Sequence, residues 1–125
     1  MPYRTNQEIF DIVSAHLLKQ NERSCTVDVN GSDPCLYRGP FMMKCAIGCL
    51  IPDDKYEKKF EDFALGSPII GPLICAAANI DPEHIELPKE LQHIHDEMDP
   101  CCWAEQLRKT ADEWKLTIPP ELLHA

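Results

Sequence analysis

The sequence is short of positive charge. Its 12 lysine and arginine residues stand against 21 aspartate and glutamate residues, which gives a formal net charge of −9 over 125 residues. Such an excess of negative charge disfavours diffuse attraction to a phosphate backbone or to an anionic lipid surface. We therefore expect no direct DNA binding and no association with a membrane.

Long apolar runs are missing as well. No stretch of the sequence approaches the roughly 18 to 20 consecutive apolar residues that cross a bilayer as a helix. Residues 1–5 contain no basic segment followed by an apolar one, so the sequence predicts no secretory signal. Together these two features predict a cytoplasmic protein.

Glycine is scarce, and the number of cysteines is odd. The five glycines form no glycine-rich loop of the kind that cradles phosphates between a strand and a helix, so no nucleotide-dependent enzyme is indicated. The seven cysteines cannot all pair with one another, and a reducing cytoplasm keeps thiols free. Free thiols or metal-bound thiolates are therefore favoured over disulfides.

Size and composition indicate one folded domain over residues 1–125. Hydrophobic residues make up 44% of the sequence and charged residues 26%, close to the composition of an average globular protein. A chain of this length fits one hydrophobic core of ordinary size.

The first predicted helix starts at a capping box. Thr5 and Glu8 are spaced so that the hydroxyl and the carboxylate can each satisfy a backbone amide at the helix start. Apolar residues then recur at helical spacing and predict one buried face down to about residue 21. The residues of that face are Ile9, Ile12, Val13 and Leu17.

Further helices follow from caps and prolines. Asp53 can cap a helix that places Tyr56, Phe60 and Phe63 on one face. A short helix is predicted over residues 73–80, and prolines at helix starts predict longer ones over 88–98 and 100–115. One more turn is predicted in residues 118–123, and the apolar segment 41–51 is interpreted as a buried short helix or turn.

A change of period predicts a small hairpin. Apolar and polar residues alternate over 25–29, turn-forming residues occupy 30–34, and a second short segment spans 35–38. The sequence thus predicts an α+β fold, mostly helical, in which the antiparallel hairpin lies on the helices. The predicted core consists of Ile9, Val13, Leu17, Val27, Ile47, Leu50, Phe60, Leu73, Leu91, Ile94, Trp103 and Leu107.

A ligand-binding site is predicted at the end of the hairpin. Tyr37 and Arg38, followed by Lys44, place an aromatic ring and two cations together in an otherwise acidic chain. The guanidinium can bind a phosphate or carboxylate while the ring stacks on a base. The alternative is an ion pair between these cations and a carboxylate of the same chain.

A metal site is a second possibility. Cys45 and Cys49 lie four residues apart, which places both thiols on one side of a helix, and His95 with either Cys35 or His93 could complete a tetrahedral zinc site. The spacing matches no zinc finger or ribbon. The alternative is that the cysteines are small buried apolar residues and that His95 forms a hydrogen bond within the core.

The same residues allow a catalytic interpretation that the sequence supports poorly. A thiol beside Lys44, with His95 and Asp96 as base and orienting group, resembles a nucleophilic triad. A reactive thiol lies in an electropositive and partly exposed place, whereas Cys45 and Cys49 lie in the most apolar run of the chain. The sequence therefore favours a non-enzymatic protein that needs no cofactor.

Several motifs resemble those of a family of short uncharacterised proteins found in bacteriophages and prophage regions. The resemblance covers most of the chain and rests on Thr5–Phe10, Cys35–Gly39, Lys44–Asp53, Leu91–Asp96 and Trp103. Residues 41–43 depart from the pattern, which would have a more polar, glycine-containing turn there. The family brings no established activity, so it assigns no role to the cysteines or to His95.

The resemblance implies a phage context, in which small acidic proteins often occupy or sequester a host component. The expected function is that of a non-catalytic inhibitor or sponge inside a bacterial host. Either its acidic surface blocks a basic groove of a host defence protein, or its Tyr37, Arg38 and Lys44 pocket traps an anionic nucleotide messenger. The alternative is a small zinc-binding or thiol-dependent protein centred on Cys45, Cys49 and His95. Self-association stays open.

Overall fold

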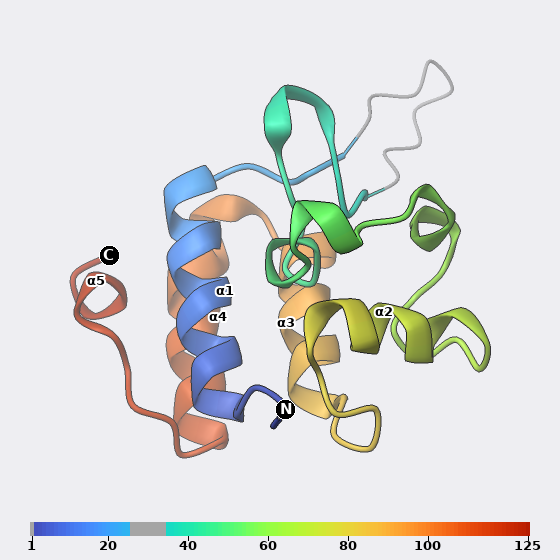
Figure 1. Ribbon diagram of the computed structural model, residues 1–125. Helices are drawn as coiled ribbons and strands as arrows, with labels where there is room; N and C mark the ends of the chain where they lie inside the picture. The colour runs from blue at the N-terminus through green and yellow to red at the C-terminus, as the bar shows by residue number, and fades with distance from the viewer. Residues whose placement is uncertain (1, 26–34) are drawn as a thin grey trace.

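Helices form the architecture of this protein. The computed structural model describes residues 2–25 and 35–125, and helical segments follow one another through both ranges (Figure 1). The α-helices are α1 (Asn6–Gln20), α2 (Ile70–Ala78), α3 (Glu86–Glu97), α4 (Pro100–Glu113) and α5 (Pro120–Leu123). Short 3-10 helices are η1 (Pro40–Met42), η2 (Gly48–Leu50), η3 (Asp53–Lys55) and η4 (Lys58–Asp62).

Helix α1 is the central element. It contacts α3, α4, α5 and η2, which brings the first helix against both the middle and the end of the chain. Figure 1 shows α1 and α4 side by side, with α5 on their outer side and α2 on the opposite side of the molecule. Of the short 3-10 helices, η2 contacts α1 and contributes the buried side chain of Leu50 to the core.

The predicted capping box of α1 is confirmed. The backbone amide of Glu8 donates to the Thr5 hydroxyl at 3.1 Å, and the Thr5 amide donates to the Glu8 carboxylate at 2.9 Å. The helix ends at Gln20, before Asn21 in the left-handed conformation. The prediction that Ile12 faces inward is wrong, since the residue is 37% exposed. Phe10 is fully buried instead.

Helices α3 and α4 follow the predicted pattern. Helix α3 starts two residues before Pro88, and α4 starts at Pro100, where the missing amide costs no hydrogen bond. Trp103 of α4 is buried, and its indole N–H donates to the carbonyl of Met98 at 3.0 Å. This hydrogen bond ties the start of α4 to the end of α3.

The predicted hairpin is wrong, and the described chain is all-α instead of α+β. Within the described ranges, Cys25 and Cys35 form one isolated antiparallel bridge and no strand. The amides of Tyr37 and Arg38 donate to the carboxylate of Glu61 at 2.8 and 3.1 Å, so they do not extend a ladder toward residues 24–25. The predicted turn over 30–34 lies outside the described residues.

The helix predicted after Asp53 is replaced by η3 and η4. Tyr56 and Glu57 between them have extended backbone, which interrupts the helical period. Phe60 is buried as predicted, but Phe63 is 42% exposed. The short helix predicted over 73–80 is α2, which begins three residues earlier and ends two residues earlier.

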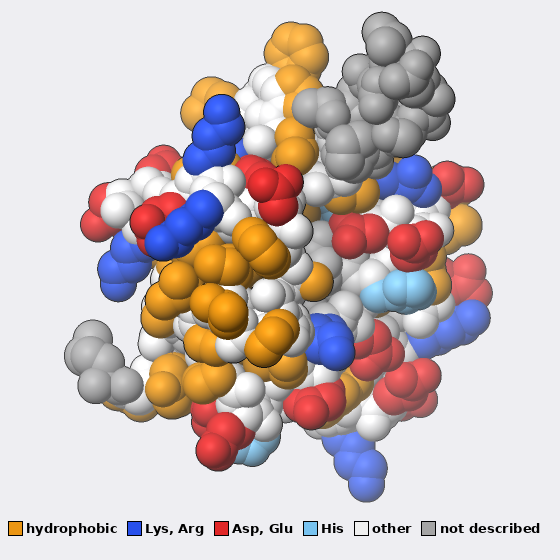
Figure 2. Space-filling view, turned by 90° about the vertical axis from the view of Figure 1, so that its right-hand side faces the viewer, with side chains coloured by type: hydrophobic (Ala, Val, Ile, Leu, Met, Phe, Trp, Pro, Cys, Tyr) orange, Lys and Arg blue, Asp and Glu red, His pale blue; other side chains and the backbone are white. Residues whose placement is uncertain are grey.

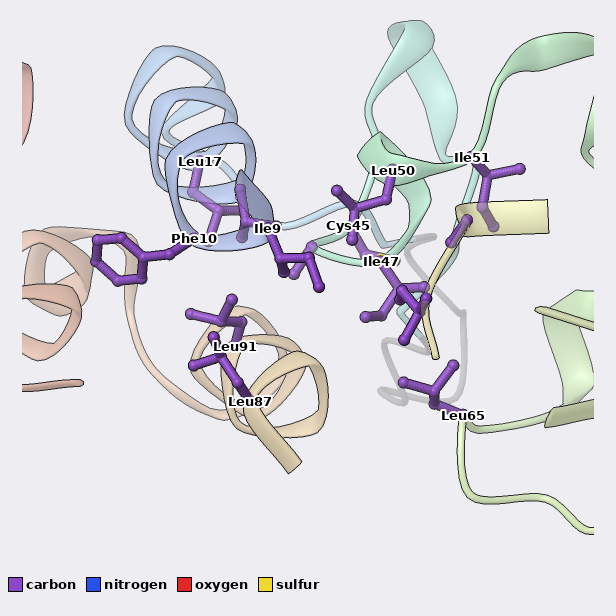
Figure 3. Packing of buried hydrophobic residues seen from close by; sticks show 14 of the residues in the cluster. Ile9, Phe10, Leu17, Cys45, Ile47, Leu50, Ile51, Leu65, Leu87 and Leu91 are labelled. Atoms are coloured by element: carbon purple, nitrogen blue, oxygen red, sulfur yellow. The ribbon is translucent and has the colours of Figure 1, made fainter. Parts of the chain in front are cut away.

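Most of the predicted core is confirmed. Side chains of α1 and α3 face one another across the centre, and residues 45–51 pack beside them (Figure 3). Leu73 is the exception at 42% exposure, because α2 turns Ile74, Cys75 and Ala78 inward. Val27 lies outside the described residues.

Candidate functional site

A histidine and an aspartate at the end of α3 form the centre of the candidate site. His95 is fully buried, and its Nε2 accepts a hydrogen bond from the backbone amide of Ser24 at 2.9 Å. An accepting Nε2 requires the ring proton on Nδ1, which therefore donates to Asp96 Oδ1 at 2.7 Å. The Trp103 ring stacks on the imidazole with its centroid 5.6 Å away. The orientation and the tautomer of His95 are thus fixed by its neighbours.

A second hydrogen bond holds the aspartate. Gln92, one helical turn earlier, donates to Asp96 Oδ1 at 2.7 Å, and its own carbonyl accepts from the amide of Ile47 at 2.9 Å. The Asp96 side chain remains 31% exposed. The carboxylate is therefore positioned from two sides and still reaches solvent.

The thiol of Cys35 completes the cluster. Ligand atoms of Cys35, His95 and Asp96 all lie within 4.8 Å of one another, and the Cys25 sulfur lies 2.9 Å from that of Cys35. Burial, the contact with the Cys25 thiol and the charge of Asp96 all raise the pKa of the Cys35 thiol well above its usual value. Cys35 is therefore protonated at neutral pH and is a poor nucleophile.

This cluster borders a pocket of about 370 Å³. Cys35, Tyr37 and Cys45 contribute to its inner wall. The charged and imidazole side chains that line it are Glu61, Asp62, Asp96, Glu97, Lys89 and His93. Figure 2 shows one face of the molecule, on which acidic side chains and a histidine gather to one side of an apolar patch. Four carboxylates against one lysine make the pocket electronegative.

The cation at the centre of the predicted anion site, Arg38, is bound by other groups of the same chain. Arg38 donates to the carbonyls of Gly48 and Ile51, each at 2.7 Å, and to the Asp53 carboxylate at 3.2 Å. Its guanidinium also lies over the Tyr56 ring, 4.8 Å from the centroid. The predicted intramolecular ion pair is therefore present, and few donors of Arg38 remain for a ligand.

Tyr37 and Lys44 line two different cavities. Tyr37 is buried, and its hydroxyl donates to the carbonyl of Phe63 at 2.7 Å. The ammonium of Lys44 lies 3.6 Å from the same Asp53 carboxylate that Arg38 contacts. The side chain of Lys44 lines a different cavity, together with His16 and Phe41.

Cys45 and Cys49 point to separate partners. The Cys45 sulfur accepts from the amide of Gly48 at 3.3 Å, and the Cys49 thiol donates to the carbonyl of Ala46 at 3.0 Å. Burial raises the pKa of both thiols, that of Cys49 to about 12. The sequence offered Cys35 or His93 as the residue that completes a metal site with His95. Among the described residues, Cys35 lies beside His95, whereas His93 is exposed.

Sequence reasoning did not identify Cys25, Ser24 or Gln92 as members of the site. The spacing of Gln92 and Asp96 on one helix face was a usable signal, because residues four apart on a helix are neighbours. The contribution of Ser24 is a backbone amide, which no residue pattern reveals.

Comparison with known proteins adds no relative. No family model, no curated protein and no solved structure matches the chain. In the described part of the chain, none of the helices has the length and apolarity that spanning a bilayer requires.

Proposed function

We propose that this protein acts by stoichiometric binding, as a phage-type inhibitor that occupies a basic surface of a host defence protein. Of the two mechanisms considered above, the contacts of the cations support the first, in which the acidic surface binds a basic groove. Arg38 and Lys44 share the Asp53 carboxylate, and Arg38 is further engaged by two carbonyls. Capture of an anionic nucleotide there would require these contacts to break, which weakens the sponge version of the proposal.

The acidic pocket supports a cationic partner. Within the described ranges, none of the carboxylates of Glu61, Asp62, Asp96 and Glu97 lies within 4.0 Å of a lysine or arginine nitrogen. Their charges are therefore not paired with a cationic side chain at contact distance. A protruding lysine or arginine of a partner would supply the missing charge, and complementary charge also speeds encounter between the two proteins.

The arrangement of the cluster supports binding over catalysis. A general base needs a free nitrogen facing a substrate, yet both nitrogens of His95 are engaged by Ser24 and Asp96. The neighbouring thiol of Cys35 is kept protonated by burial and by nearby acidic groups. Neither residue is prepared for repeated turnover.

Titration calorimetry tests this proposal on the full chain. Basic nucleases of bacterial defence systems and a panel of cyclic nucleotides are titrated separately. We expect saturable binding of a basic protein at a fixed stoichiometry. Turnover of a nucleotide, or tight binding of a nucleotide with no protein bound, would contradict the proposal.

Matched charge variants locate the binding surface. The double variant Asp62→Asn with Glu97→Gln removes two negative charges beside the pocket, where both residues are exposed. Asp112→Asn with Glu113→Gln removes two from exposed positions on α4. We expect the first pair to weaken binding about tenfold or more and the second to change it about twofold or less. Equal effects would refute a binding site at the pocket.

The Cys35, His95 and Asp96 cluster favours a second candidate, a zinc-binding protein. These thiol, imidazole and carboxylate groups are ligands that zinc accepts. Binding through Nδ1 of His95 would remove the proton it donates to Asp96, while Nε2 still accepts from Ser24. Cys35 and Asp96 would thus be the ligands, with His95 orienting the carboxylate from outside.

Metal analysis separates this candidate from the first. If the protein acts by binding a basic partner without a metal, protein purified without chelator should contain less than a stoichiometric amount of zinc. Bound zinc that is lost in Cys35→Ser and kept in Cys45→Ser would establish the second candidate at this cluster. If bound zinc is lost only in Cys45→Ser, the zinc site lies at Cys45 and Cys49.

A further inference from the structure

The thiols of Cys25 and Cys35 lie in direct contact. Their sulfur atoms are 2.9 Å apart, and the two residues lie opposite one another in an antiparallel bridge. The amide of Leu36 donates to the carbonyl of Ser24 at 2.6 Å, which fixes the two backbone segments beside the sulfurs. The contact is therefore set by the main chain as well as by side-chain rotamers.

Residues opposite one another in an antiparallel pair have the separation that a disulfide needs. Their Cα atoms are roughly 4.5 to 5.5 Å apart, within the roughly 4.4 to 6.8 Å range found across disulfides. Both cysteines are half-buried, so a small reagent can reach them. The bridge and the sulfur contact together therefore match the geometry that a disulfide requires.

We propose that Cys25 and Cys35 form a site of reversible oxidation, which a low-molecular-weight disulfide converts into an intramolecular disulfide. The thiolate of one of the two cysteines attacks one sulfur of the reagent, breaks its S–S bond and releases one reagent thiolate. The thiolate of the other cysteine then attacks the cysteine sulfur of this mixed disulfide and releases the second reagent thiolate. The two cysteines lose two electrons, the reagent gains them, and the two cysteine protons protonate the released thiolates.

The contact between the two thiols favours closure of the disulfide once either of them has reacted. The raised pKa of Cys35 keeps its thiolate scarce at neutral pH, so attack by Cys35 on the reagent is slow. Once a mixed disulfide forms on either cysteine, the thiol of the other is already in contact, so the second attack is intramolecular. The proposal is independent of the acidic pocket, since it needs only the two thiols and the backbone that holds them.

Cys101 and Cys102 provide an internal control. Both are exposed, and their sulfurs lie 3.7 Å apart at the start of α4. A bond between neighbours in sequence would strain the helical backbone at that point. These residues should therefore take up the reagent as mixed disulfides, without a bond between them.

The test is redox titration of the full chain with reduced and oxidised glutathione, in the presence of a chelator. Samples are acid-quenched, free thiols are alkylated, and proteolytic peptides are analysed by mass spectrometry. We expect a peptide linked through Cys25 and Cys35, with an equilibrium constant at least about tenfold above that of any other cysteine pair. In Cys25→Ser and Cys35→Ser the remaining partner should carry glutathione instead, and Cys101→Ser should retain the linked peptide.

Two results would overturn the proposal. One is the absence of the linked peptide from the wild-type chain at every glutathione ratio. The other is pairing of Cys25 or Cys35 with other cysteines as readily as with each other. Both are read from the wild-type protein, so they hold whether or not the serine variants fold.

Discussion

At the scale of single residues, Glu61 fixes the local structure around residues 37–38 and 56. Its carboxylate accepts from the amides of Tyr37 and Arg38 and, at 2.5 Å, from the hydroxyl of Tyr56. Burial and this last hydrogen bond raise the pKa of Tyr56 to about 12. One side chain of η4 thus satisfies the backbone where a second hairpin strand was predicted.

Replacing Glu61 by glutamine should destabilise the fold by about 1–3 kcal/mol, because the amide NH₂ places donors against groups that themselves donate. Urea unfolding followed by circular dichroism measures the change in the free energy of unfolding. Glu57→Gln is the control, since Glu57 is exposed and its carboxylate pairs with the exposed Lys59 at 3.6 Å. Equal loss in both variants would contradict the role given to Glu61.

His16 should make the stability depend on pH. Burial lowers the pKa of His16 below its usual value, and its Nε2–H donates to the carbonyl of Lys44 at 2.8 Å. The unfolded chain then binds a proton at higher pH than the folded chain, so stability falls as pH drops below about 6.5.

Urea unfolding at a series of pH values between neutrality and mild acid tests this expectation. His16→Gln can keep a hydrogen bond to Lys44 and cannot titrate, so its stability should change less over this range. The exposed His84 acts in the opposite sense, since its hydrogen bond with Asp81 raises its pKa. A wild-type profile as flat as that of the variant would contradict the role of His16.

At the scale of elements, the turn at η1 is unfavourable for its own residues. Phe41 and Met42 both have positive φ, 57° and 63°, and their side chains are 95% and 91% exposed. Left-handed backbone suits glycine and asparagine, and the resemblance had suggested a polar, glycine-containing turn at these positions. A turn of that composition would adopt the positive φ values at lower cost than Phe41 and Met42 do.

Phe41→Asn with Met42→Gly should therefore stabilise the protein by about 1–2 kcal/mol, since both new residues accept positive φ at lower cost. The increase in the free energy of unfolding would be measured with urea. Phe63→Asn is the control, because Phe63 is exposed but has φ of −132°. An unchanged or lower stability of the double variant would show that the turn is not strained.

The sequence predicts those elements whose signals are local. The capping box of α1 and the proline at the start of α4 act within one helical turn, and both are confirmed. The prediction of a hairpin was wrong because the amides of Tyr37 and Arg38 donate to a carboxylate more than 20 residues away in the sequence. The alternation of residue types carries no information about such a long-range partner.

The candidate site follows the same distinction. Burial of His95 was predictable from its place on the apolar face of α3, and its pairing with Cys35 was one of two alternatives. The partners of Arg38 include carbonyls of η2 and Ile51, which depend on a close approach. Gly48 permits this close approach because it has no Cβ, which would overlap the carbonyl oxygen of Tyr37.

At the scale of the whole molecule, charge is the property most directly tied to the proposed function. The chain carries a net charge of −9. The cations around Asp53 are paired with its carboxylate. In the described ranges, the carboxylates beside the pocket are not paired with lysine or arginine. Charge that is left unpaired acts over distance on an approaching protein. Binding through this face should therefore be faster than binding through a neutral surface.

Salt should consequently slow association more than it affects dissociation. Raising the ionic strength from about 0.01 M to about 0.15 M shortens the range of charge interactions from about 30 Å to about 8 Å. We expect the association rate with a basic partner to fall by about tenfold or more over this range, as stopped-flow mixing would measure. In Asp62→Asn with Glu97→Gln the fall should be smaller, because less charge remains beside the pocket. An association rate that ignores salt would leave shape and apolar contact as the basis of binding, and the acidic surface would lose its proposed role.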